Sequence, residues 1–116
     1  MRVTRIYTGA DQASHFEDYE VELADQGVIG FMSARHAVRS LIFRHTEPSY
    51  DYAWHTAPER QYIVILDGGV EVEIGDGTRR TFGPGDVMFV EDTTGQGHCS
   101  RAVGNRARRS LFITID

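Results

Sequence analysis

The sequence contains no apolar run approaching the roughly 20 residues that a membrane-spanning helix needs, and its first residues lack the apolar core of a secretory signal. We therefore expect a cytoplasmic protein that does not engage a membrane. There is a single cysteine, Cys99, which excludes an internal disulfide and a multi-cysteine zinc site. We expect Cys99 to be a small buried hydrophobic residue rather than a nucleophile.

Positive charge is also in deficit, with 12 Lys and Arg against 17 Asp and Glu and a net charge of −5. A negative surface repels phosphate backbones, so we expect no nucleic-acid partner. The one basic concentration comprises Arg101, Arg106, Arg108 and Arg109, on both sides of a Gly-Asn turn. We interpret it as a solvent-exposed hairpin that offsets the acidic surface.

The 116 residues are enough for one domain, and no long helix is evident. From residue 37 onward, short β segments alternate with turn residues at intervals typical of a β-sandwich or barrel. We predict strands over residues 37–45, 61–66, 70–74, 87–90, 98–103 and 108–115. Residues 1–36 are less periodic, and we interpret them as an N-terminal arm that covers a sheet edge, either on its own barrel or on a partner subunit.

One polar residue, Gln61, begins an otherwise apolar predicted strand. Side chains alternate between the faces of a strand, so Gln61 shares its face with Ile63 and Ile65. A buried amide needs a hydrogen-bonding partner, because burying it without one costs about 1–3 kcal/mol. The sequence therefore predicts that Gln61 meets a neighbour, a water, a ligand or a metal.

The segment WHTAPERQYIVILDG at residues 54–68 resembles the first motif of the cupin superfamily, which contains HxH, a proline-bearing loop, a Glu and a Gly seven positions later. His55 matches the first histidine and Gly68 the glycine. Ala57 stands where the second histidine would be, and Gln61 replaces the glutamate. Two of the three ligands that this motif offers are therefore altered.

The second cupin motif, PxGD followed by a strand, a loop and a histidine, is similar to Pro84, Gly85, Asp86 and His98, with a loop about two residues longer than the common form. The resemblance covers residues 37–115 and is to small single-domain bacterial cupins of the conserved-barrel type with a degenerate metal-binding motif. It implies an all-β fold, the double-stranded β-helix or jelly-roll barrel, over residues 37–116.

Cupins that bind metal hold it with three imidazoles and one carboxylate pointing into the barrel. Here the resemblance implies only His55, Gln61 and His98 as ligands of a weakly held divalent ion such as Zn, Ni, Mn or Fe, or no metal at all. The remaining histidines, His15, His36 and His45, are expected to be hydrogen-bonded surface or core residues.

Two functions follow from this reading. In the first, a small-molecule enzyme uses His55 and His98 as acid and base while Gln61 orients the substrate, as in an isomerase, dehydratase or cyclase; with metal, the same site would support oxygenase chemistry. In the second, the barrel is a non-catalytic binding or sensor module, which the loss of ligands at Ala57 and Gln61 favours.

Further residues are candidates for contact with the ligand. Trp54, Tyr52 and Ile63 are candidate walls of the cavity, although an aromatic residue at a strand start is packing material at least as often. Asp92 lies in a loop that either closes over the mouth or only forms a turn. We also expect a homodimer, because twofold dimers are the commonest soluble oligomers and the arm needs an edge to cover.

Overall fold

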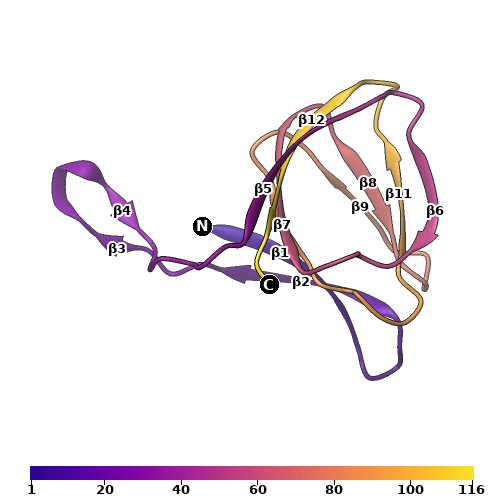
Figure 1. The fold of residues 1–116 in the computed structure, drawn as a ribbon, viewed down its shortest axis with the longest axis horizontal. Coiled ribbons are helices and arrows are strands. Elements are labelled where there is room, and N and C mark those ends of the chain that lie inside the picture. The colour runs from indigo at the N-terminus through magenta and orange to yellow at the C-terminus, as the bar shows by residue number, and fades with distance from the viewer.

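Twelve strands and one 3-10 helix make up the regular structure of the protein, for which a computed structural model describes residues 1–116. The larger sheet has six strands in the order β2-β1-β10-β7-β12-β5, and the smaller has four in the order β6-β11-β8-β9. The strands of these sheets are β1 (Arg2–Thr8), β2 (Ser14–Glu20), β5 (Ser40–Thr46), β6 (Asp51–His55), β7 (Gln61–Asp67), β8 (Val70–Glu73), β9 (Arg79–Phe82), β10 (Val87–Val90), β11 (His98–Ala102) and β12 (Arg108–Thr114). The two sheets face each other as a barrel (Figure 1), so the predicted all-β barrel is confirmed.

The core lies between the two sheets and is built by alternating side chains. On β8, Val70 and Val72 are buried whereas Glu71 and Glu73 face outward, as the alternation predicts. The same core contains Ile6, Ile65, Phe82 and Met88. Burying side chains of this size contributes about 1.5–3 kcal/mol each. These contacts hold the sheets at a fixed distance and leave one end of the barrel interior for a cavity.

The first twenty residues of the N-terminal arm lie in the larger sheet. Strand β1 pairs in parallel with β10, with Ile6 opposite Val90, and β2 pairs antiparallel with β1. The side chains of Val3 and Ile6 are buried. Of the two edges that the arm could cover, it therefore covers the edge of its own barrel.

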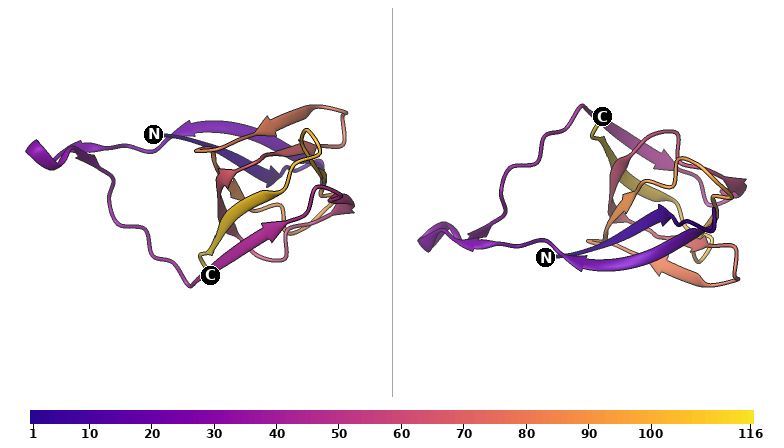
Figure 2. Two further views of the ribbon diagram at one scale, coloured as in Figure 1. Left: turned by 90° about the horizontal axis from the view of Figure 1, so that it is seen from above. Right: turned by 90° about the horizontal axis from the view of Figure 1, so that it is seen from below.

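Between β2 and β5 the chain leaves the barrel as a small hairpin of β3 (Ala24–Asp25), η1 (Gly27–Ile29) and β4 (Phe31–Met32). Both views in Figure 2 show this hairpin extended away from the two sheets. Its apolar side chains are exposed, namely Val28, Ile29, Phe31 and Met32. The sequence assigned this segment only to the N-terminal arm, without a strand pattern of its own. No helix of the structure combines the length and the apolar character needed to cross a membrane.

Candidate functional site

A cavity of about 390 Å³ opens inside the barrel between the two sheets. Its size suits a small organic molecule, since ligand pockets are typically about 300–1,000 Å³. Apolar side chains from both sheets form much of the wall. Five of the residues predicted to form the site line this cavity: Tyr52, His55, Gln61, Ile63 and His98.

The two histidines meet because β6 and β11 pair antiparallel with His55 opposite His98. Their ring centroids are 4.5 Å apart. Gly97, immediately before His98, has a φ of 72°, and a Cβ there would lie 2.0 Å from the carbonyl oxygen of His55. Only glycine lets the loop enter β11 this close to His55. The strand register and the glycine at position 97 thus bring His55 and His98 together at one cavity, as the motif spacing predicts.

His98 is held from behind by a buried carboxylate. Its Nδ1 donates to Asp92 Oδ2 over 2.6 Å, and Ser14 Oγ donates to the same oxygen over 2.7 Å. Asp92 is fully buried, and its other oxygen, Oδ1, is buried without a hydrogen-bond partner. Because Nδ1 is taken up by Asp92, Nε2 is the ring nitrogen left for a ligand in the cavity.

This geometry corrects the expectation for Asp92, which was proposed to contact the ligand from a loop over the mouth. Asp92 does not line the cavity, because its side chain turns inward to His98 and Ser14. The sequence signal was the acidic residue six positions before His98 in a lengthened loop. What the sequence could not show is that Ser14 of β2 reaches the same carboxylate.

His55 is oriented by its own strand and by an aromatic neighbour. Its Nδ1 donates to the carbonyl oxygen of Ala53 over 2.8 Å, and its ring stacks on Tyr52 with centroids 3.7 Å apart. Burial lowers the pKa of His55 below its usual value, and the neighbouring His98 lowers it further, while the Ala53 hydrogen bond opposes both. The neutral ring therefore presents the lone pair of Nε2.

Gln61 and Ile63 line the cavity, as the alternation predicts, but Ile65 does not; it is buried in the core at the far end of the strand. Gln61 is 5% exposed. Its backbone is held in the sheet opposite Val90 of β10 and Thr114 of β12. The backbone of Gln61 is therefore fixed at the cavity wall, where the side-chain amide can orient a polar group of a ligand.

Trp54 does not line the cavity, which corrects its assignment as a wall residue. Half of its surface is exposed, and it lies on β6 between Ala53 and His55. The neighbouring Tyr52 does line the cavity although it is similarly exposed at the rim. The register shift between His98 and Ser100 on β11 is what lets Tyr52 and His55 reach the same space without Trp54.

The donor set does not fit a divalent metal. Nowhere in the chain do three or more His, Cys, Asp or Glu side chains come together as a metal site. Near His55 and His98, the position of the missing imidazole is Ala57, which is buried among apolar side chains, and the neutral amide of Gln61 stands where the motif has a carboxylate. The one carboxylate that lines the cavity, that of Glu59, is paired with Arg39. Two imidazoles and an amide fall short of the three or four strong ligands that such sites use.

Two arginines that were not predicted to belong to the site also line the cavity, namely Arg44 on β5 and Arg108 on β12. The expectation that the basic concentration around the Gly-Asn turn is solvent exposed is wrong for Arg108, which is 5% exposed. The missed signal is alternation, because Arg108 shares a strand face with Ser110, Phe112 and Thr114, all directed into the barrel.

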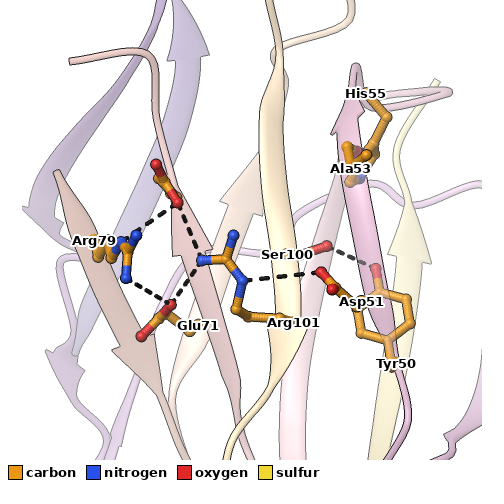
Figure 3. Close-up of polar contacts among 9 residues, drawn as sticks. Tyr50, Asp51, Ala53, His55, Glu71, Arg79, Ser100 and Arg101 are labelled. Carbon is orange, nitrogen blue, oxygen red and sulfur yellow. Dashed lines mark hydrogen bonds and ion pairs between the residues drawn. The ribbon is translucent and has the colours of Figure 1, made fainter. Parts of the chain in front are cut away.

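A polar contact joins the arginine end of the cavity to the histidine end. The hydroxyl groups of Tyr50 and Ser100 are 2.6 Å apart, and both residues line the cavity (Figure 3). Tyr50 lies just before β6, and its carbonyl oxygen accepts a hydrogen bond from Ala102 on β11. Ser100 is two residues after His98 on the same strand.

No protein-family model and no curated protein matches this sequence. Solved structures do match its fold. The cupin domain of Cnp3 from Schizosaccharomyces pombe is 13% identical, covers 99% of this chain and 84% of its own, and has a TM-score of 0.53. A Neisseria meningitidis protein is 18% identical with 84% of each chain covered and a TM-score of 0.53.

A Klebsiella pneumoniae protein with a double-stranded β-helix domain is 18% identical, covers 65% of this chain and 64% of its own, and has a TM-score of 0.50. Identities this low establish the fold and not the chemistry. Together with the two facing sheets and the cavity between them, they show that the chain is a small cupin-fold protein, a double-stranded β-helix barrel.

Proposed function

We propose that the protein is an acid–base enzyme, of the isomerase or lyase type, acting on a small molecule inside the barrel without a metal. The observation that carries this proposal is the buried pair of Asp92 and His98 at the cavity wall. A carboxylate that holds Nδ1 fixes the tautomer of the imidazole and leaves Nε2 free to take a proton. Asp92 acts through His98 and is a positioning residue.

The proposed step is abstraction of a proton from carbon next to a carbonyl group. His98 Nε2 takes the proton, the C–H electron pair moves into the carbonyl to give an enolate, and the proton returns to the same or a neighbouring carbon. Gln61 hydrogen-bonds the carbonyl oxygen. His55, neutral and 4.5 Å away between ring centroids, is placed to relay or return the proton. No oxidant or co-reactant is consumed.

The test is proton–deuterium exchange measured by NMR in D2O, with a panel of small ketones, aldehydes and oxo acids. We expect exchange with the wild type and a loss of at least about 100-fold in His98→Gln, since general acid–base groups contribute about 100- to 10,000-fold. Asp92→Asn should reduce the rate and, in addition, change the ¹⁵N shifts of His98, because an amide no longer imposes the same tautomer.

A binding or sensor module is the second candidate function, favoured by the apolar Ala57 where a motif histidine is expected. It predicts that panel members raise the melting temperature without any exchange. Thr78→Ser, in the turn before β9 and outside the cavity, is the matched control and should exchange at the wild-type rate. Ligand binding with no exchange above the background rate would contradict the enzyme proposal.

We also propose that the protein is a homodimer. The projecting hairpin exposes Val28, Ile29 and Phe31, and the edge strand β5 exposes Leu41 and Phe43. A second copy can cover both apolar surfaces at once, because twofold symmetry presents each to the partner. Light scattering should give twice the 13.1 kDa chain mass. Changing Val28, Ile29 and Phe31 to Ser should shift it toward the monomer, and a wild-type monomer at micromolar concentration would contradict the proposal.

A further inference from the structure

We propose that the ligand of this cavity carries an oxyanion group, a carboxylate or a phosphate, and that Arg108 and Arg44 bind it. The inference rests on the proposed function only in placing the ligand between the two sheets. It adds the chemical class of the ligand and a subsite distinct from the histidine pair.

Every cation of the chain other than histidine and the N-terminus is an arginine, since the 12 Lys and Arg are all Arg. Eight of them form ion pairs with carboxylates: Arg2, Arg5, Arg39, Arg60, Arg79, Arg80, Arg101 and Arg109. Two others, Arg35 and Arg106, are exposed to solvent. The two that have neither a carboxylate nor free exposure to water are Arg44 and Arg108, and both line the cavity.

Arg108 is the more constrained of the two. Its Nε is buried without a hydrogen-bond partner, and its Nη2 makes only a long contact of 3.5 Å with Thr46 Oγ1. Burial lowers the pKa of the guanidinium, and nearby Arg44 adds to this, while Tyr50 opposes it. A buried charge without a counter-ion is strongly destabilising, so its place at a cavity wall calls for an acceptor from outside the chain.

Both guanidinium groups lie near one aromatic ring. The Cζ atoms of Arg44 and Arg108 are 5.6 Å and 5.1 Å from the ring centroid of Tyr50, and Arg44 is also 5.0 Å from that of Phe112. The ring faces offset part of the charge but offer no in-plane oxygen to the N–H groups. A carboxylate or phosphate group accepts two such hydrogen bonds at once and neutralises the repulsion between the two cations.

The chain itself supplies no such anion. The single acidic residue that lines the cavity is Glu59, and its ion-pair partner is Arg39, 3.8 Å away. The arginine end is also within reach of the histidine end. Tyr50 contacts Ser100, and Ser100 is two residues, about 6.6 Å of strand, from His98. A small organic acid bound at Arg108 can therefore place its reactive carbon near His98.

The experiment compares three probes of one shape in NMR titrations at neutral pH and low salt: benzoate, phenyl phosphate and the neutral benzamide. We expect the wild type to bind an oxyanion at least about 10-fold more tightly than benzamide, because charge-assisted bidentate hydrogen bonds are the strong ones. A preference for benzoate identifies a carboxylate ligand, and a preference for phenyl phosphate identifies a phosphate ligand.

Arg108→Met should weaken oxyanion binding at least about 10-fold, and Arg108→Lys should weaken it less, since it keeps the charge and loses the fork. The matched control is Arg109→Met, which removes the adjacent arginine from the outer face, where it pairs with Asp67, and should bind as the wild type does. If Arg108→Met does not fold, Arg44→Met carries the same test, with an expected loss of about 3-fold or more.

The inference is overturned if the wild type binds benzamide as tightly as the oxyanions, if it binds none of the three probes at millimolar concentration, or if a folded Arg108→Met binds them unchanged. Its failure is distinguishable from that of the proposed function. Exchange on neutral ketones without oxyanion binding overturns this inference alone. If oxyanion binding persists in His98→Gln but neither the wild type nor any variant catalyses proton–deuterium exchange, the enzyme proposal alone is overturned.

Discussion

The outer face of the smaller sheet and the inner wall of the barrel treat arginine in opposite ways. On the outer face, Arg101 reaches Glu71 at 2.8 Å and Glu73 at 3.1 Å, and Arg79 flanks the same two carboxylates from β9 (Figure 3). On the inner wall, Arg108 has no carboxylate and has a buried Nε without a partner. The arginines of the outer face thus have carboxylate partners within the chain, whereas Arg108 on the inner wall has none.

The difference teaches where to look for function. Ion pairs at a surface contribute little to stability, about 0–1 kcal/mol each, but they show that this chain readily supplies a carboxylate for an arginine. The cavity holds two arginines and two histidines but only one carboxylate, that of Glu59, whose ion-pair partner is Arg39. A site that concentrates uncompensated donors in an enclosed space is suited to an anionic ligand, and it is unsuited to a metal cation.

The largest expected effect is a gain of metal affinity when the cavity is changed from one that suits an anion to one that suits a metal cation. Ala57→His together with Gln61→Glu adds an imidazole and a carboxylate at two positions that line the cavity with His55 and His98. The result is a shell of three histidines and one carboxylate, so we expect divalent metal affinity to rise at least about 100-fold. Calorimetric titration of Ni²⁺, Zn²⁺ and Mn²⁺ into chelator-treated wild type and variant measures it.

Each single change should tighten metal binding less than the pair, because one added ligand leaves the shell incomplete. The new carboxylate should also weaken binding of benzoate. Ala57 is 4% exposed within the core cluster, so the larger imidazole has a packing cost, and circular dichroism separates loss of fold from loss of binding. A folded double variant with wild-type metal affinity would show that the four positions do not converge.

Most of the fold could be predicted from the sequence, because the alternation of apolar and polar residues indicates where the strands lie. The predicted strand at 87–90 coincides with β10, and β7, β8, β11 and β12 each end within one residue of their predicted ends. Strand β6 was missed because Tyr52 and Trp54 lie among polar residues, and β9 because Arg79, Arg80 and Thr81 show little apolar signal. Edge and rim strands carry the weakest patterns.

Only part of the site could be predicted from the sequence, because motif spacing encodes strand register but not long-range contacts. The spacing of the cupin-like motifs brought His55, Gln61 and His98 to one cavity, since motif spacing encodes strand register. Long-range partners carry no such signal. Nothing in the sequence joins Ser14 to Asp92, which are 78 residues apart, or places Arg44 and Arg108 near the ring of Tyr50. Charge clustering around the Gly-Asn turn suggested solvent exposure instead.

A smaller effect is expected on stability, where an ion-paired arginine of the outer face and an unpaired arginine of the inner wall should differ in their contribution to the free energy of unfolding. Arg101→Met leaves Glu71 and Glu73 with only Arg79 between them, so we expect the free energy of unfolding to fall slightly, as for other solvent-screened ion pairs. Arg108→Met removes a buried unpaired charge, so the ligand-free variant should be unchanged or more stable by up to about 2 kcal/mol. Urea denaturation measures both, and a clear loss of stability in Arg108→Met would assign that arginine a structural role.

The smallest effect is a pH dependence from His55, another cavity group whose positive form is disfavoured. Burial lowers its pKa in the folded protein below the usual value of about 6.5, so the unfolded chain takes up the proton first as the pH falls. The contribution of His55 is therefore fully present above about pH 6.5 and is lost as the pH falls through the folded-state pKa. Carboxylates with lowered pKa values, such as Asp18 and Asp67, act in the same direction but only below about pH 4. Urea denaturation at pH 7 and pH 5 should therefore show a loss of stability in the wild type that is smaller in His55→Gln. Equal losses in the two proteins would mean that the cavity does not penalise a charged His55, and the contrast between the outer face and the inner wall would then be confined to the arginines.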